Sequence, residues 1–194
     1  MKKWMLFISL FTVLIACEKD RFQNAVIQEE LRNPTTEIDR VFVNDDLRLT
    51  FTEDSSFFVK AAAIEGHLGF IETHFETSTL FASTSGGGIP GAYKEVFIGG
   101  YPIAFIKHDG IGLVKGSPNA KQIELYQNGL GLMSLNFQCE SIELTVGNSG
   151  PVNLRGTVER LSIVQNNAGT VRCGELQADI GKVVNNGSGD VYVN

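Results

Sequence analysis

The segment Lys107-His108-Asp109 carries the residue types best suited to acid–base chemistry in this chain. A carboxylate beside a histidine can orient the imidazole ring as a general base. The segment runs into Gly110 and Gly112, however, and glycines at this spacing are typical of a turn. We therefore predict a polar turn at this place and no catalytic residue.

The other two histidines, His67 and His74, are seven residues apart, which would put them on opposite faces of one strand. That separation is unsuited to holding one metal ion. The sequence also has no paired-cysteine motif, no phosphate-binding glycine loop, no Gly-x-Ser-x-Gly motif and no Asp-x-Asp-x-Asp-Gly calcium loop. We predict no catalytic, cofactor-binding or metal-binding residues.

Carboxylates recur at a spacing of 19 residues, as Glu124 with Glu143 and Glu140 with Glu159. If these positions stack on neighbouring strands, each pair is separated by about 4.8 Å, close to the spacing of the two carboxylates in retaining glycosidases. Basic residues lie near them in the sequence: Lys121, Arg155, Arg160 and Arg172. A charged, solvent-exposed face explains the whole set, and an enzymatic pair is the less favoured alternative.

The N-terminus reads as an export signal in three parts. Met1-Lys2-Lys3 is basic, residues 4–15 are apolar, and Leu14-Ile15-Ala16-Cys17 ends the run at a cysteine. The run is shorter than the about 20 apolar residues of a transmembrane helix, so we predict a signal peptide over residues 1–16. The last four residues resemble the lipobox of bacterial lipoproteins, which implies that Cys17 is lipidated. The alternative is an ordinary secretory signal.

Residues 17–37 carry mixed charges and no sustained apolar period, so we expect the lipidated cysteine to begin a flexible tether. Glu18-Lys19-Asp20 resembles, in part, the acidic signal that exports some Bacteroidota-type lipoproteins to the cell surface. An ordinary solvated linker fits equally well. We therefore expect a lipid anchor in the outer membrane, with display at the cell surface or on the periplasmic face both open.

The composition favours strands over helices. The chain has 13 phenylalanines and 21 glycines against 5 prolines, a mix typical of strands separated by glycine turns. The formal net charge is -6, which argues against the clustered positive potential that nucleic-acid binding requires. The length suits one folded domain, which we place at residues 38–194.

A repeat of 19 residues dominates the second half of the sequence. Residues 122–140, 141–159 and 160–178 align without a gap. The aligned columns are Ile123, Ile142 and Leu161, then Leu125, Leu144 and Ile163, then the turn glycines Gly131, Gly150 and Gly169. A single segment of 19 residues cannot bury its own apolar face, whereas stacked segments bury a continuous column of apolar side chains. We predict an all-β fold: a parallel β-solenoid of about five rungs of about 19 residues, preceded by a β-rich N-terminal section.

The last rung fits this period only with one inserted residue, which we place near Gly181. In the same alignment Cys139 shares a column with Val158 and Gln177, two rungs away from the row of Cys173. Two rungs are about 9.6 Å, whereas a disulfide needs Cα atoms within about 7 Å. We therefore predict two free thiols, with Cys173 in the core.

The order of these parts resembles the head GIN domain, also called the putative auto-transporter adhesin family, which is found mostly in Bacteroidota. The resemblance covers roughly residues 38–193. It rests on Asp46-Leu47-Arg48-Leu49-Thr50-Phe51, on Phe58-Val59-Lys60 and on the closing Gly187-Ser188-Gly189-Asp190-Val191. It implies a β-helix-like fold and an adhesive role, and it supplies no catalytic residues.

We therefore expect a non-enzymatic cell-envelope lipoprotein that acts as an adhesin or as a glycan- or protein-binding module. A structural envelope lipoprotein and a carbohydrate-active β-helix enzyme stay open as alternatives. The expected partners are the membrane, through Cys17, and a glycan or protein ligand, without nucleic acid. An exposed aromatic platform would favour glycan binding, but the outward-pointing tyrosines do not share a column: Tyr93, Tyr101, Tyr126 and Tyr192.

Overall fold

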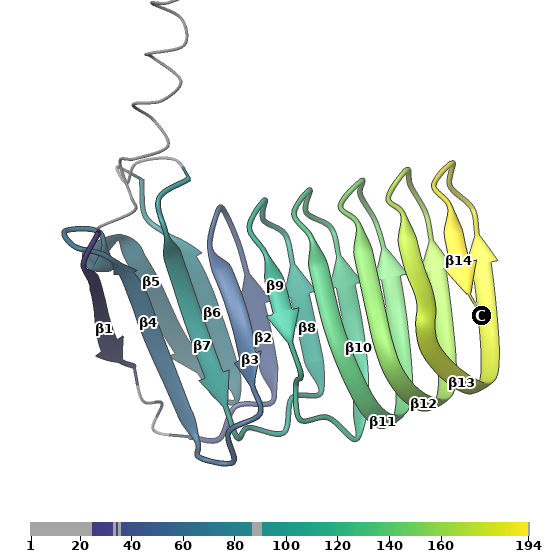
Figure 1. Cartoon of the computed structure of the whole chain (residues 1–194), viewed down its shortest axis with the longest axis horizontal. Coiled ribbons are helices and arrows are strands. Elements are labelled where there is room, and N and C mark those ends of the chain that lie inside the picture. The colour runs from purple at the N-terminus through teal and green to yellow at the C-terminus, as the bar shows by residue number, and fades with distance from the viewer. Residues whose placement is uncertain (1–24, 33, 35, 87–90, 194) are drawn as a thin grey trace, which may run out of the picture.

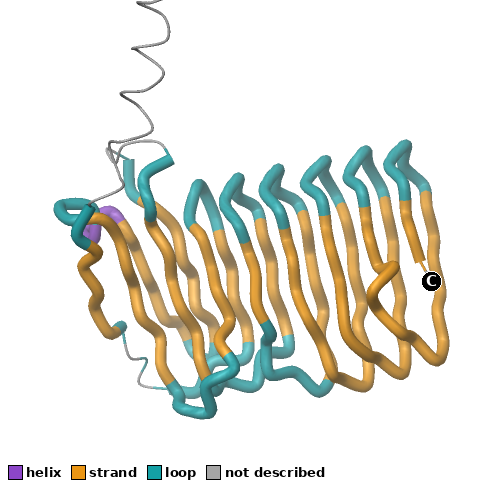
Figure 2. Tube along the Cα trace, in the orientation of Figure 1, coloured by secondary structure: helices purple, strands orange, loops and turns teal. Residues whose placement is uncertain are grey.

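The computed structural model describes residues 25–32, 34, 36–86 and 91–193. These residues form 14 strands and one short 3-10 helix, with no α-helix among them (Figure 2). In chain order the elements are β1 (Ile27–Leu31), β2 (Arg40–Val43), β3 (Arg48–Thr52), β4 (Phe58–Ile64), η1 (Leu68–Phe70), β5 (Ile71–Glu76), β6 (Thr79–Thr84), β7 (Lys94–Gly99), β8 (Phe105–His108), β9 (Val114–Gly116), β10 (Gln122–Gln127), β11 (Met133–Val146), β12 (Val152–Gln165), β13 (Val171–Asn185) and β14 (Val191–Val193). Within this part of the chain no helix is long and apolar enough to cross a bilayer. The predicted signal peptide, Cys17 and the first part of the tether lie outside the described residues. The later part of the predicted tether is not free chain, because residues 27–31 form β1 and pair with β4.

Stacked rungs make up most of the fold (Figure 1). β10 pairs in parallel with β11, and β11 pairs in parallel with β12. Leu125, Leu144 and Ile163 lie opposite one another in this register, and each is at most 1% exposed. Because each rung fills the same inward position with an aliphatic side chain, the core is one continuous column. The predicted β-solenoid and its 19-residue register are confirmed.

Each long strand serves both faces of the solenoid. The first half of β11 pairs with β9, where Met133 lies opposite Val114, and its second half pairs with β10, where Ser141 lies opposite Gln122. β12 continues both pairings along its whole length, and β13 follows β12 in the same way. The chain bends between the two halves of each strand, so two sheet faces enclose the core and meet at the bend (Figure 1).

The inserted residue of the last rung lies next to Cys173 and Gly174, and the prediction near Gly181 is wrong. The register of β12 against β13 shifts between Asn153 and Arg155, from an offset of 19 to an offset of 20. Gly174 is exposed and has open space around it, so it can occupy a β-bulge. The sequence alignment missed this position because the segment that follows Leu135, Leu154 and Cys173 in each repeat has no repeated apolar column. Without such a column, a shift of one residue leaves no mark in the alignment.

The bulge changes which side chains of β13 face the core. Leu176 points inward and is only 2% exposed, and Ala178, not Gln177, lies opposite Val158. The predicted column of Cys139 with Gln177 is therefore wrong, because one extra residue exchanges the inward and outward positions of a strand.

The two described cysteines are both free thiols. Cys173 is 1% exposed and belongs to the hydrophobic core, whereas Cys139 is half-buried and packs against the edge of that core. The prediction that Cys173 lies in the core is confirmed.

The first half of the chain adds a rung to the solenoid and then closes one end of it. β2 lies between β6 and β8, and β3 lies between β7 and β9, all in parallel. Val41 faces Ile106 and Leu49 faces Val114, so this rung extends the core columns. Beyond it, β4 pairs antiparallel with β7 and β1, and β5 pairs antiparallel with β6. The β-rich N-terminal section is as predicted, whereas its additional rung was not foreseen.

Candidate functional site

His108 lies inside the fold at the end of β8, so the predicted polar turn does not include its side chain. The side chain is fully buried, and its Nδ1 lies 2.9 Å from Oε1 of Gln127. Asp109 pairs instead with Lys107, with Oδ2 and Nζ 2.6 Å apart. Burial lowers the pKa of His108 against the opposing effect of Gln127. The histidine is therefore neutral and interior, and it forms no dyad with Asp109.

A side-chain amide supports the turn in three of the rungs, and two of these amides, Gln127 and Gln165, are fully buried. Nε2 of Gln127 donates to the carbonyl oxygen of Gly131 over 2.6 Å. Gln165 and Asn185 make the corresponding hydrogen bond to the carbonyl four residues later. These bonds satisfy backbone groups that a tight, buried turn would otherwise leave unpaired. The amides are therefore part of the framework and do not form a binding site.

The other histidines do not converge on a common site. His67 directly precedes η1, and His74 lies in β5. Among the described residues no group of three or more histidine, cysteine, aspartate and glutamate side chains could hold a metal ion.

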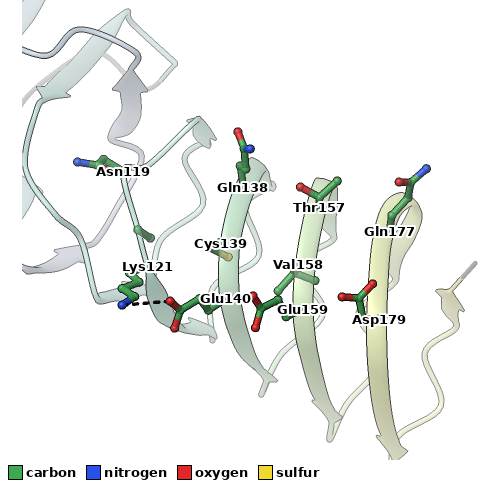
Figure 3. A pocket seen from close by; sticks show the side chains of 11 residues that line it. Asn119, Lys121, Gln138, Cys139, Glu140, Thr157, Val158, Glu159, Gln177 and Asp179 are labelled. Carbon is green, nitrogen blue, oxygen red and sulfur yellow. Dashed lines mark ion pairs between the residues drawn. The ribbon is translucent and has the colours of Figure 1, made fainter.

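A groove crosses β11, β12 and β13 at the bend between the two sheet faces (Figure 3). Its volume is about 530 Å³. The side chains that line it come from the middle of these strands and from the segment before β10: Asn119, Ala120, Lys121, Gln138, Cys139, Glu140, Thr157, Val158, Glu159, Gln177 and Asp179. The groove thus runs along the solenoid axis, across successive rungs.

The lining consists of two rims and a floor. The amide rim carries amide and hydroxyl groups, from Asn119, Gln138, Thr157 and Gln177. The charged rim carries one amine and three carboxylates, from Lys121, Glu140, Glu159 and Asp179. The floor is formed by Ala120, Cys139 and Val158. In Figure 3 the side chains of Gln138 and Gln177 point away from those of Glu159 and Asp179, with the floor between them.

The bulge in β13 completes both rims. An offset of 19 would place Leu176 and Ala178 at the rim positions of this strand. The offset of 20 places Gln177 there, opposite Thr157, and brings Asp179 beside the preceding rung. Sequence reasoning found the pairing of carboxylates on the earlier rungs but missed these last members, since the position of the bulge was misplaced.

Hydrogen bonds hold Glu140 in its ionised form. Nζ of Lys121 lies 3.1 Å from its Oε1, and Nε2 of Gln122 donates to its Oε2 over 3.3 Å. These two contacts lower the pKa of Glu140. Glu159 has a longer contact, 3.8 Å, with Nη1 of Arg160.

The predicted stacks of carboxylates are confirmed. Glu124 lies directly opposite Glu143 on exposed positions, and the register of β11 with β12 brings Glu140 beside Glu159. A glycosidase needs one carboxyl group whose pKa is raised so that it can donate a proton. The pKa of Glu140 is shifted in the opposite direction. The shift of Glu140 does not suit the acid of such a pair, and the groove offers hydrogen bonds and charge.

A stripe of aromatic rings crosses the outer face of β6, β2, β8 and β10. The ring centroids of Phe81 and Phe42 are 5.0 Å apart, those of Phe42 and Phe105 are 5.3 Å apart, and those of Phe105 and Tyr126 are 5.3 Å apart. The guanidinium group of Arg40 lies 4.0 Å from the Phe105 centroid. Such cross-strand pairs stabilise a sheet by about 0.2–1 kcal/mol each. The sequence alignment missed the stripe because two of its strands lie before the repeat.

Together these features define a parallel β-solenoid whose outer surface carries a polar groove along the stacking axis. Residues 37–194 match the family described as putative auto-transporter adhesin, head GIN domain, and the chain belongs to this family. No curated protein matches the chain in sequence.

Three solved structures of similar fold come from species of Bacteroides and Parabacteroides. A putative adhesin from Bacteroides fragilis has a TM-score of 0.74 and 16% identity, over 89% of this chain and 81% of that one. A putative adhesin from Parabacteroides distasonis has a TM-score of 0.58 and 13% identity, over 88% and 83%. A putative lipid binding protein from the same species has a TM-score of 0.51 and 14% identity, over 88% and 98%. At these identities the similarity shows the shared fold.

Proposed function

We propose that this chain is a non-enzymatic adhesin of the bacterial cell envelope that holds a glycan or protein ligand on its outer surface. The observation that carries the proposal is the groove across β11, β12 and β13, found in a member of an adhesin family. Its amides, carboxylates and hydroxyl group can bind a ligand through many weak contacts. The ionised state of Glu140 is suited to accepting hydrogen bonds and unsuited to donating a proton to a leaving group.

The proposal includes a lipid anchor on Cys17 in the outer membrane. The basic start, the short apolar run and the lipobox-like Leu14-Ile15-Ala16-Cys17 support it. Two or more acyl chains give a stable membrane attachment, and the residues between Cys17 and the start of β1 at Ile27 would then separate the solenoid from the bilayer. Cys17→Ala should abolish incorporation of labelled fatty acid and release the chain from the membrane fraction. A variant that still carries the label would exclude Cys17 as the anchor.

Adhesion is tested with intact cells that express the full chain, against cells that lack it. The measurement is retention on immobilised glycans and matrix proteins, together with protease treatment of the cell surface. Retention that depends on the chain, with protease access, supports a surface adhesin. A chain that is protected from protease and retains no ligand would instead be a structural envelope lipoprotein. Release of sugar fragments from a bound glycan would make it an enzyme.

A further inference from the structure

The side chains of the amide rim have no protein partners among the described residues. Stacked glutamines can form a ladder in which each amide bonds to the next. Here Thr157 separates Gln138 from Gln177, and no hydrogen bond joins any of these three side chains to another described residue. With Asn119, three amides and one hydroxyl group thus face solvent along one side of the groove, with their donors and acceptors available.

The floor between the rims is small and apolar. Ala120, Cys139 and Val158 present methyl and thiol groups, and Val158 is only 4% exposed. Donors and acceptors on both sides of a narrow apolar floor match the surface of a sugar chain, whose ring edges carry hydroxyl groups and whose ring faces carry C–H groups. The rungs repeat every about 4.8 Å, so the same set of contacts recurs along an extended chain.

The charges of the groove limit the kind of sugar that it accepts. Lys121 is the one basic side chain in the lining, and it is engaged with Glu140 at 3.1 Å. Glu159 and Asp179 follow on the next two rungs, and within the described residues Asp179 forms no ion pair. A ligand with a carboxylate or sulfate on each unit would meet like charges at Asp179 and at Glu159, whose contact with Arg160 is a long 3.8 Å.

We propose that this groove binds an extended, non-acidic glycan that lies along the solenoid axis, with its hydroxyl groups bonded to Gln138, Gln177, Glu159 and Asp179. This inference rests on the proposed adhesive function and names the class of its ligand. The sugar rings lie over the floor, and each rung contributes one side chain from the amide rim and one from the charged rim. The aromatic stripe lies on other strands, so it is a separate surface from this site.

The test is calorimetric titration of the full lipidated chain in detergent with neutral hexasaccharides (cellohexaose, mannohexaose, xylohexaose and N-acetylchitohexaose) and with acidic hexagalacturonate. We expect at least one neutral probe to bind about tenfold or more tightly than hexagalacturonate. Gln138→Ala with Gln177→Ala should weaken that binding by about tenfold. Glu159→Gln with Asp179→Asn should reduce the discrimination against hexagalacturonate. Tighter binding of hexagalacturonate by the wild-type chain, or no binding of any neutral probe, would overturn the proposal.

The matched control is Glu124→Gln with Glu143→Gln, which removes two stacked carboxylates from exposed positions outside the groove. We expect this control to leave binding unchanged. Equal losses in the control and the groove variants would place the ligand elsewhere. Circular dichroism confirms that each variant is folded.

Alkylation of Cys139 with N-ethylmaleimide offers a second measurement on the unaltered sequence. The adduct would fill the floor and block the neutral probe, and Cys139→Ser should be insensitive to the reagent. Binding that survives complete alkylation would overturn the proposal. If cells still adhere when the groove variants no longer bind sugar, adhesion itself stands and only the groove assignment fails.

Discussion

Replacement of Gln127 by alanine tests whether the buried amides hold the turns of the solenoid together. The side chain is fully buried. Its Nε2 donates to the carbonyl oxygens of Gly129 and Gly131 over 3.3 and 2.6 Å, and its Oε1 lies 2.9 Å from Nδ1 of His108. Alanine removes all three contacts and leaves their partners in a region that water does not reach.

The expected cost follows from the two shorter contacts, those to Gly131 and His108. A buried polar group that loses its partner costs about 1–3 kcal/mol, so two such groups cost about 2–6 kcal/mol. We expect Gln127→Ala to lower the free energy of unfolding by about 4 kcal/mol. That loss is a large share of the about 5–15 kcal/mol that stabilises an ordinary domain.

The assay is urea unfolding at neutral pH, followed by far-UV circular dichroism. Gln127→Leu fills the same space without hydrogen bonds and should still cost about 2 kcal/mol or more. Glu124→Gln, on the outward side of the same strand, should stay within about 0.5 kcal/mol of the wild type. A Gln127→Leu variant as stable as the wild type would show that the side chain contributes only its volume, and the reasoning would be refuted.

Three further predictions concern the core. Leu144→Ala should lower the free energy of unfolding by about 3–5 kcal/mol, because backbone hydrogen bonds fix the rung spacing and prevent the neighbouring side chains from closing the cavity. Urea unfolding measures this loss, and a loss equal to that of Glu143→Ala would contradict the prediction. Burial lowers the pKa of His108 in the folded state below its ordinary 6.5, so the unfolded chain binds more protons at low pH. The free energy of unfolding should therefore be level above about pH 6.5, and at lower pH it should fall by up to about 1.4 kcal/mol per pH unit. If His108→Gln shows the same slope between about pH 7.5 and 5.5 as the wild type, this histidine is not the cause. N-ethylmaleimide should modify Cys139 in the folded chain and Cys173 only after unfolding, because Cys173 is 1% exposed whereas Cys139 is only half-buried. Burial raises the pKa of both thiols, that of Cys173 to about 11. Mass spectrometry of the unreduced chain should show two thiols, and equal rates of modification would argue against the register.

The regular rungs could be predicted because parallel stacking keeps a constant sequence offset. Leu125, Leu144 and Ile163 are separated by the same 19 residues in the sequence and lie opposite one another in space. The rung formed by β2 and β3 could not be found in this way. Val41 pairs with Ile106 across an excursion that contains β3 to β7, so no fixed offset connects the two residues.

The candidate site was predicted only in part, for the same physical reason. The stacking of Glu140 on Glu159 follows from the period, and it is present. The groove around it depends on the bend of each strand and on the bulge, and neither has a residue pattern of its own in the sequence. His108 was misjudged because polarity indicated an exposed turn, whereas Gln127 on the next rung gives its ring a partner inside the core.

The bulge beside Gly174 has a consequence for how such a surface can change over generations. Side chains alternate along a strand, so the gain or loss of one codon before Leu176 swaps every exposed and hidden position up to the next turn. A single inserted residue can therefore add the polar side chains of one more rung to the groove. Substitutions at Gln177 and Asp179 change only the chemistry of side chains that already line it. Insertions and deletions in this strand therefore change how many rungs contribute side chains to the groove, whereas point substitutions change only the chemistry of those side chains.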